Sequence, residues 1–241
     1  MLQWMISHAQ TELEANPDII TRFHILVGVA GTFSLAYTLS FLFYNLCDNP
    51  QYVDELRAEA ESCLKESGCW DFPTLEKMKK IESFMCESQR LSPGMILTFN
   101  RLVMQPITLS DGFHLPKGTR ITMASREIQL DPEVVPEADK FVPFRCYRAR
   151  KQPGEDIKNR FVTTSSEKLH FGYGTQACSG RQLAQVIVKM IFTSVLMGWD
   201  VEYVEGQHRP PSLVVEDFRV SYTGSRRIKM RRRKAIAGMP C

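Results

Sequence analysis

The first part of the chain reads as one continuous helix, because hydrophobic positions dominate it and turn signals occur only at its ends. A turn at residues 16–18 marks its start, a turn at residues 48–50 marks its end, and only tolerated glycines lie between them. Residues 25–47 carry no charge, and a run of this length is long enough to cross a bilayer. The pattern predicts a long helix over residues 18–48.

This uncharged run has two interpretations. A membrane span is usually uniformly lipophilic with basic flanks, whereas hydroxyl and amide side chains recur inside residues 25–47 and the flank that follows is acidic. Helices that are apolar on all sides also occur in the cores of large soluble domains. We interpret the run as the buried central helix of a soluble domain, with a transmembrane helix and a cytosolic tail as the alternative.

Two amphipathic helices are predicted next. Residues 51–67 are rich in helix formers and end at Gly68. Thr74 is a candidate N-cap for a helix over residues 74–91, in which apolar side chains fall on one face and lysines on the other. Pro93 follows directly and ends this helix.

The second half of the chain combines short strands, coil and one more helix. Segments 95–109 and 120–125 are rich in β-branched residues and are separated by glycine turns, which predicts a hairpin or a small sheet. Residues 130–168, rich in proline and charge, form a long coil, and coils of this length are usually functional. The apolar stretch 180–198 predicts a helix. The strand-like pieces after it are residues 200–204 and 218–224.

Composition and charge narrow the class of protein. With 241 residues, of which 44% are apolar, the chain can bury a core. The net charge of +3 comes mostly from clusters such as residues 231–234, which are typical of a solvated terminus, so we expect no nucleic-acid partner. The seven cysteines include no C-x-x-C pair, which argues against a zinc site or a disulfide framework. Residues 1–18 are polar and mildly acidic, unlike a secretory signal.

The sequence around one cysteine favours a role as a metal ligand over a role in packing. Free cysteines usually pack as small hydrophobic side chains. Cys178, however, follows Gly172 and Gly174 and precedes Gly180, at the start of the predicted 180–198 helix. The glycines permit tight turns and close approach of a flat ligand, and a helix N-terminus stabilises a thiolate. A thiolate is the ligand that a haem iron needs for oxygen activation.

The segment FGYGTQACSG resembles the haem-ligand signature of the cytochrome P-450 monooxygenases, F-x-x-G-x-x-x-C-x-G, with an alanine four residues later. The matching residues are Phe171, Gly174, Cys178, Gly180 and Ala184. Two further motifs of the family occur in the expected order. Glu87 and Arg90 match its E-x-x-R motif, and residues 141–145 match its F-x-P-x-R motif. The resemblance implies that Arg145 completes a buried ion-pair network with Glu87 and Arg90.

The resemblance implies a mainly α fold with small β-sheets, the C-terminal haem-loop half of the cytochrome P-450 fold. Residues 1–241 are then one partial domain. In it, residues 18–48 are the distal helix and residues 74–91 the E-x-x-R helix. The haem-ligand loop covers residues 170–180, and the proximal helix covers residues 180–198.

The resemblance also implies a cofactor, haem, with Cys178 as its axial thiolate and metal ligand. The haem-binding residues that it implies in the loop are Phe171, Gly172, Gly174, Gln176 and Gly180. Gln176 stands where relatives carry arginine or histidine toward a haem propionate, so we expect weaker anchoring there. Arg101 aligns with a second propionate-binding arginine. His170 has no partner at metal-ligand spacing, so we interpret it as a packed or solvated side chain.

On the distal side, the resemblance places Ala30, Gly31 and Ser34 at the catalytic, oxygen-handling motif. Ser34 takes the place of the family's threonine and keeps a hydroxyl that can donate a hydrogen bond to dioxygen. Phe33 takes the place of an acidic or polar residue. Phenylalanine cannot relay a proton. This departure therefore argues against coupled monooxygenation.

The implied function is insertion of one oxygen atom from O2 into a small apolar substrate, with NADPH electrons delivered by a separate reductase. The chain resembles most closely fungal members that act in terpenoid-like secondary metabolism. Lys151, Lys158 and Arg181 are candidate contacts for an acidic reductase face. The location implied by full-length relatives is the cytosolic face of the endoplasmic reticulum membrane. Because we find no counterpart of their usual N-terminal anchor, the alternatives are the cytoplasm and membrane association through the apolar run 25–47. The alternative function is a truncated, inactive relative that acts as a haem-binding or interaction module.

Overall fold

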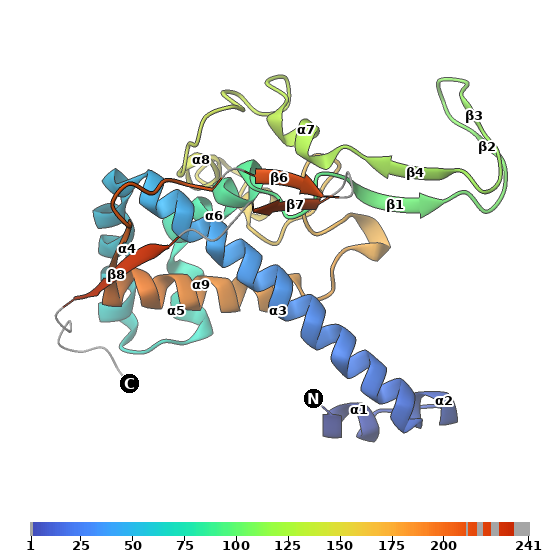
Figure 1. Ribbon diagram of the computed structural model, residues 1–241, viewed down its shortest axis with the longest axis horizontal. Coiled ribbons are helices and arrows are strands. Elements are labelled where there is room, and N and C mark those ends of the chain that lie inside the picture. The colour runs from blue at the N-terminus through green and yellow to red at the C-terminus, as the bar shows by residue number, and fades with distance from the viewer. Residues whose placement is uncertain (1, 211, 216–218, 223–226, 234–241) are drawn as a thin grey trace.

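The long helix at the start of the sequence crosses the molecule in the computed structural model, which describes residues 2–210, 212–215, 219–222 and 227–233. This helix is α3 (Pro17–Asp48), and the short helices α1 (Leu2–Ser7) and α2 (Glu12–Ala15) precede it (Figure 1). The Asn16 side chain accepts hydrogen bonds from the first amides of α3, and Pro17 occupies its first turn, as expected at a helix start.

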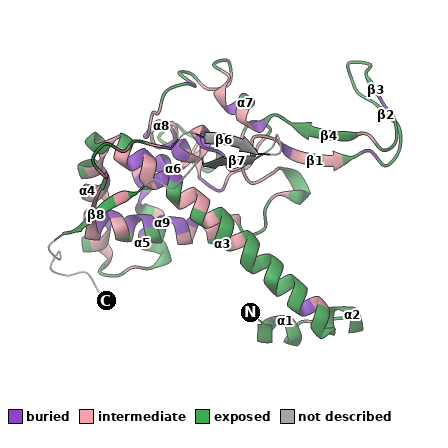
Figure 2. Cartoon of the chain, in the orientation of Figure 1, coloured by how far each residue is buried: buried purple, intermediate pink, exposed green. Residues whose placement is uncertain are grey.

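Burial along α3 is uneven. Residues 21–30 are all exposed, whereas Phe41, Leu42 and Leu46, near its end, are at most 2% exposed (Figure 2). The prediction of a helix buried throughout was therefore wrong for its first part. The reason is that α6 and α9 pack against α3, and its buried residues, Ile20 apart, lie in its last two turns. Within the described residues, α3 is also the one helix long and apolar enough to span a membrane.

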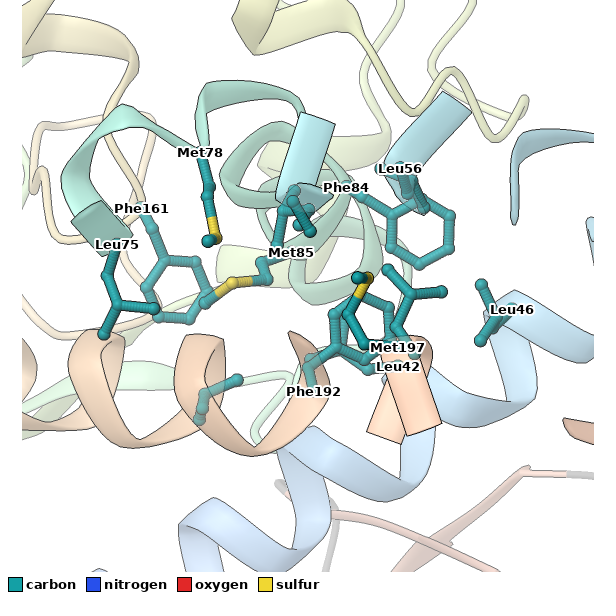
Figure 3. Close-up of a cluster of buried hydrophobic side chains, with 14 of the residues drawn as sticks. Leu42, Leu46, Leu56, Leu75, Met78, Phe84, Met85, Phe161, Phe192 and Met197 are labelled. Carbon is teal, nitrogen blue, oxygen red and sulfur yellow. The ribbon is translucent and has the colours of Figure 1, made fainter. Parts of the chain in front are cut away.

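The hydrophobic core lies among helices from both halves of the chain. The helices that form it with the end of α3 are α4 (Val53–Ser67), α5 (Phe72–Lys77), α6 (Lys79–Leu91) and α9 (Arg181–Gly198). Phe84 of α6 stacks on Phe192 of α9 with ring centroids 5.7 Å apart, and both side chains are fully buried (Figure 3). Leu42 and Leu56 fill the space beside them.

The helix predicted over residues 74–91 is two helices, and its predicted cap was wrong. Asp71 caps α5: its Oδ1 accepts hydrogen bonds from the Thr74 amide at 2.8 Å and from the Thr74 hydroxyl at 2.6 Å. Met78 leaves the helical conformation, with φ −77° and ψ 72°, and α6 begins after it. A carboxylate three residues upstream therefore takes the capping role, and Thr74 lies inside the first turn.

The strands form small two-stranded antiparallel sheets, as predicted. The pairs are β1 (Thr98–Leu102) with β4 (Arg120–Met123), β2 (Ile107–Thr108) with β3 (His114–Leu115), β5 (Trp199–Tyr203) with β8 (Ile228–Arg232), and β6 (Ser212–Val215) with β7 (Arg219–Tyr222). Parts of the predicted segment 218–224 and of the basic cluster 231–234 lie outside the described residues.

Between β4 and α9 the chain follows the long coil that the sequence predicts. Short helical segments occur within this coil. They are α7 (Ser125–Leu130), α8 (Arg145–Ala149), η2 (Ile157–Asn159) and η3 (Gly174–Gln176), and η1 (Pro50–Tyr52) joins α3 to α4. The coil ends in the loop that leads into α9, and this is the loop that holds Cys178.

Candidate functional site

The loop before α9 is anchored on the core at one end and exposed at the other. Leu169 is 2% exposed, and Phe171 packs edge-on against Phe161, with ring centroids 5.5 Å apart. Gly172 and Gly174 then adopt left-handed backbone conformations, with φ of +74° and +70°. A side chain at Gly172 would place its Cβ 3.3 Å from the Gln176 carbonyl oxygen, so glycine is required there.

Cys178 lies at the exposed end of this loop. Its amide donates to the Phe171 carbonyl oxygen at 2.6 Å, and its own carbonyl accepts a hydrogen bond from Arg181 Nη1 at 2.8 Å. These bonds fix the backbone on both sides of the thiol, while the side chain stays exposed. An added Cβ on Gly180 would lie 3.9 Å from the sulfur, so this glycine leaves the space beside the sulfur clear.

The donor set at Cys178 suits a group with one axial protein ligand. Among the residues that the structure describes, no cluster of three His, Cys, Asp or Glu side chains could hold a metal ion. A zinc site would need such a cluster, whereas a haem needs a single thiolate and a flat, open approach. The exposed residues 173–176 and the glycines around the exposed sulfur fit that requirement.

The two residues predicted to contact the haem propionates, Gln176 and Arg101, lie on different elements. Gln176 is exposed in η3, on the same loop as Cys178. Arg101 lies on β1, where its Nη1 donates to the Asn100 carbonyl at 2.9 Å and its guanidinium lies 4.1 Å from the centre of the Phe99 ring. The described side-chain contacts of Arg101 are thus with its own strand.

The predicted distal residues lie on the exposed part of α3. The Ser34 hydroxyl donates to the carbonyl oxygens of Ala30 at 2.8 Å and Gly31 at 3.3 Å. Serine often bonds back to its own helix in this way, and the hydroxyl must rotate to serve a ligand. Phe33 is 57% exposed. No contact described in the structure joins these four residues to Cys178.

Glu87, Arg90 and Arg145 come together in a buried ion-pair network. Arg90 binds Glu87 with two parallel hydrogen bonds, Nη2 to Oε1 at 2.8 Å and Nε to Oε2 at 3.0 Å. Arg145 Nε approaches Glu87 Oε2 at 3.4 Å, and the Val142 amide donates to Oε1 at 2.9 Å. The Glu87 side chain is 2% exposed, so these donors replace the water that the carboxylate has lost.

The remaining donors of Arg90 hold the long coil in place. Arg90 donates to the carbonyl oxygens of Gln129 at 2.9 Å, Ala138 at 2.7 Å and Lys140 at 2.9 Å. Arg145 reaches the carbonyls of Pro136 and Glu137 in the same coil. The network therefore fixes irregular backbone between β4 and α8 onto α6.

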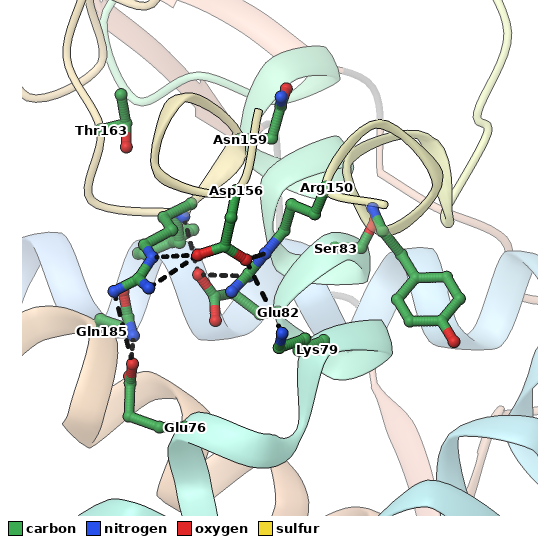
Figure 4. A network of polar contacts seen from close by, with 12 residues as sticks. Glu76, Lys79, Glu82, Ser83, Arg150, Asp156, Asn159, Thr163 and Gln185 are labelled. Atoms are coloured by element: carbon green, nitrogen blue, oxygen red, sulfur yellow. Dashed lines mark hydrogen bonds and ion pairs between the residues drawn. The ribbon is translucent and has the colours of Figure 1, made fainter. Parts of the chain in front are cut away.

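A second buried network, which the sequence analysis did not predict, surrounds Glu82 of α6. Lys189 Nζ of α9 lies 2.9 Å from Glu82 Oε2. Arg150 Nη1 lies 3.2 Å from Glu82 Oε1 (Figure 4). The Phe161 amide also donates to Oε1 at 3.0 Å. Although burial alone would raise it, Lys189 and Arg150 hold the pKa of Glu82 below its ordinary value. One signal could have revealed this site: Lys189 is the only charge between Arg181 and Asp200.

Asp156 extends this second network toward the surface. It binds Arg160 at 2.7 Å. It also binds Arg150 at 2.9 Å, and Lys79 lies 3.7 Å away (Figure 4). The hydrogen bond from Arg160, together with that from Arg150, lowers the pKa of Asp156 to about 2. The coil after α8 is thereby tied to α6.

A cavity of about 330 Å³ lies behind the loop and beside α6. His170 lines it, and burial, with help from Lys168 and Arg90, lowers the pKa of His170 to about 4. The imidazole is therefore neutral near pH 7. The same wall holds Cys86 and Cys146, which the sequence analysis did not single out.

Comparison with known proteins matches nearly the whole chain. The family model described as cytochrome P450 matches residues 2–223. A cytochrome P450 monooxygenase of Emericella nidulans is 38% identical over 233 residues, which cover 97% of this chain and 43% of that protein. An ent-kaurene oxidase of Gibberella intermedia is 34% identical over 219 residues, covering 90% of this chain and 41% of that protein.

The fold is also similar to that of a solved structure. A zebra fish cytochrome P450, determined with abiraterone, superposes with a TM-score of 0.75 at 20% sequence identity. The match covers 97% of this chain and 53% of that one. At this identity the match speaks for the fold alone. The chain spans less than half the length of the curated relatives named above.

Proposed function

The chain belongs to the cytochrome P450 family, and from this premise we propose that it is the thiolate-bearing part of a haem-thiolate monooxygenase. The reaction is insertion of one oxygen atom from O2 into a small apolar substrate, with NADPH electrons supplied through a separate reductase. The similarity to a fungal ent-kaurene oxidase supports a terpenoid-like substrate in secondary metabolism.

The observation that carries this proposal is the geometry of Cys178. Its thiol is exposed at the start of α9, and hydrogen bonds of its own amide and carbonyl fix its position. When bound, a haem supplies the oxygen-activation chemistry, which the side chains of the protein cannot perform. Cys178 would be its axial ligand. The residues that would frame it are Phe171, Gly172, Gly174 and Gly180, with Gln176 and Arg101 toward the propionates.

The chain's own residues have positioning and proton-holding roles in this proposal. Phe171, packed on Phe161, holds the start of the loop against the core, so that Cys178 is presented from a fixed base. On α3, Phe33 cannot hold a proton, and Ser34 can hold one at Oγ once that hydroxyl leaves the carbonyl of Ala30. Ala30, whose side chain is a methyl group, and Gly31, which has none, leave room beside it.

The proposed reductase contact uses basic side chains of the long coil and of the start of α9. Lys151 lies with its Nζ 4.6 Å from the centre of the Tyr147 ring, and Arg181 bonds the Cys178 carbonyl. Lys158 is paired with Glu155 at 2.6 Å, and this exposed pair can open at little cost. An acidic partner surface would meet these cations. We place the protein at the cytosolic face of the endoplasmic reticulum membrane, with α3 as a candidate for membrane association.

A second candidate is a haem-binding or interaction module without turnover. The exposure of residues 21–30, together with Phe33 at the acid position of the motif, favours it. In this case the chain binds haem through Cys178 but transfers no oxygen.

Turnover under labelled dioxygen separates the two candidates. The chain, expressed with haem supply, is combined with an NADPH-dependent reductase and ent-kaurene under ¹⁸O2, and products are analysed by mass spectrometry. We expect a product that carries one ¹⁸O atom and is absent with Cys178→Ser. If the protein binds haem but gives no labelled product with ent-kaurene or a panel of other apolar terpenoids, the module without turnover is the better description.

A further inference from the structure

Two cysteines lie in the wall of the cavity beside α6. Cys86 lies on α6 and Cys146 on α8, and both line this cavity of about 330 Å³. One turn before Cys86, Ser83 Oγ accepts a hydrogen bond at 2.9 Å from the amide of Tyr147, the residue after Cys146. The ion pair between Glu87 and Arg145, at 3.4 Å, joins residues next to the two cysteines in the sequence. These two contacts, on either side of the cysteines, hold the segments of α6 and α8 that carry Cys86 and Cys146 against each other.

The surroundings make the two thiols unequal. The hydrogen bond from Cys86, with Lys168 and Arg145 nearby, lowers the pKa of the Cys146 thiol, although burial and Glu87 act in the opposite direction. The same hydrogen bond and burial raise the pKa of the Cys86 thiol well above its usual value. Cys146 is thus the better nucleophile, because the thiolate is the reactive form. Cys86 is placed to react second.

We propose that Cys86 and Cys146 are a redox pair that forms a reversible disulfide when the protein meets hydrogen peroxide. Both thiols line a cavity large enough to admit so small an oxidant. The site is distinct from Cys178, which lies on the loop and is not among the cavity-lining residues. The proposal does not depend on haem binding.

The proposed chemistry balances with peroxide as the oxidant. The Cys146 thiolate attacks one peroxide oxygen, the O–O bond breaks, and hydroxide leaves and takes up the thiol proton as water. Cys146 is then a sulfenic acid. The Cys86 sulfur attacks it, a sulfur–sulfur bond forms, and the second water leaves with the Cys86 proton. Two thiols lose two electrons and two protons in total, and one peroxide becomes two waters.

The disulfide would tie α6 to α8 at the network that fixes the coil. It would close a loop of about 60 residues, and a cross-link of that span restricts the unfolded chain. It would also hold Glu87 and Arg145 together covalently through their neighbours. We therefore expect peroxide treatment to raise the thermal midpoint of unfolding, and a thiol reductant to reverse this rise.

Peptide mapping of the wild-type chain tests the pair without any substitution. The chain is treated with stoichiometric hydrogen peroxide, its remaining thiols are alkylated, and it is digested with trypsin. We expect a species that joins peptide 81–90 to peptide 146–148, lighter by two hydrogens than the two thiol peptides together, and lost on reduction. Alkylation of both Cys86 and Cys146 after peroxide treatment that oxidises the exposed Cys69 would overturn the proposal.

Two variants test the order of the steps, with circular dichroism to show that each is folded. In Cys86→Ser, dimedone should trap Cys146 as its sulfenic acid, because the second thiol is missing. In Cys146→Ser, Cys86 should be oxidised on the order of tenfold more slowly than Cys146 is in Cys86→Ser. The matched control Cys63→Ser, a buried cysteine elsewhere, should leave the cross-linked peptide unchanged. Dimedone labelling of Cys86 in Cys146→Ser as fast as that of Cys146 in Cys86→Ser would contradict the assigned order.

Discussion

The inner face of α6 buries its charged side chains, whereas the loop before α9 leaves its cysteine exposed. On α6, Glu82 and Glu87 are 1% and 2% exposed, and each carboxylate is surrounded by cations and backbone amides of the chain itself. On the loop, Cys178 is exposed, and the described bonds beside it are made by its backbone. The carboxylates on α6 thus stabilise the fold, whereas Cys178 on the loop is accessible to a ligand.

This difference has an energetic consequence. Removing one partner of a buried ion pair leaves an uncompensated charge and typically costs about 3–5 kcal/mol, whereas exposed positions contribute little. Stability should therefore depend on α6, and ligand binding on the loop. The predictions that follow test this separation through the free energy of unfolding, from the largest expected change to the smallest.

The largest effect is expected at Lys189. Lys189→Ala removes the cation 2.9 Å from Glu82 and leaves the carboxylate dependent on Arg150. We expect a loss of about 3–5 kcal/mol in unfolding free energy, measured by urea denaturation. The control Lys229→Ala breaks an exposed pair with Glu202 and should change it by less than about 0.5 kcal/mol. Equal losses in the two variants would show that the buried network contributes no more to the free energy of unfolding than an exposed ion pair.

His170 lies on the loop but faces the cavity beside α6, so it tests the boundary between the two regions. Its pKa is lowered in the folded state from 6.5 to about 4. Between these values the unfolded chain binds a proton that the folded chain does not, so stability falls as pH is lowered through this window. The contribution is up to about 3 kcal/mol. Urea midpoints between pH 7 and pH 4 should therefore fall less in His170→Gln. An unchanged slope would place the imidazole in solvent.

A smaller effect is expected at Arg145, the more exposed member of the Glu87 network. Its side chain is 22% exposed, and its Nε lies 3.4 Å from Glu87, which keeps its closer bonds to Arg90. Arg145→Gln should cost about 1 kcal/mol by thermal denaturation. A loss as large as that of Lys189→Ala would mean that Arg145, and not Arg90, carries the network.

The smallest effect on stability is expected at Cys178. Because the thiol is exposed and the loop is held by backbone bonds, Cys178→Ser should change the unfolding free energy of the haem-free chain by less than about 0.5 kcal/mol. Urea denaturation of the variant beside the wild type measures this. A loss of several kcal/mol would show that Cys178 is a packing residue and would remove the contrast between the two regions.

Short-range patterns and motifs predicted part of this molecule well. The bounds of α3 and α9 follow from turn signals and hydrophobic runs, and Glu87 and Arg90 are neighbours on one helix, so a local motif identifies them. The break at Met78 was missed because the apolar pattern continues across it.

The features that sequence analysis missed depend on contacts between distant parts of the chain. Glu82 and Lys189 are 107 residues apart, and only the packing of α6 on α9 brings them together. Cys86 and Cys146 likewise meet only when α8 lies against α6. Hydropathy also could not show which part of α3 is covered, since its residues are apolar on every side.

The central claim is that Cys178 is the thiolate ligand of a haem, and the difference spectrum of the reduced protein with carbon monoxide tests it most directly. The spectrum is recorded for the wild type, for Cys178→Ser and for Cys69→Ser, which removes another exposed thiol. A red-shifted, thiolate-type Soret band is predicted for the wild type and Cys69→Ser and not for Cys178→Ser. A folded wild type without this band, or a Cys178→Ser variant that keeps it, would contradict the claim.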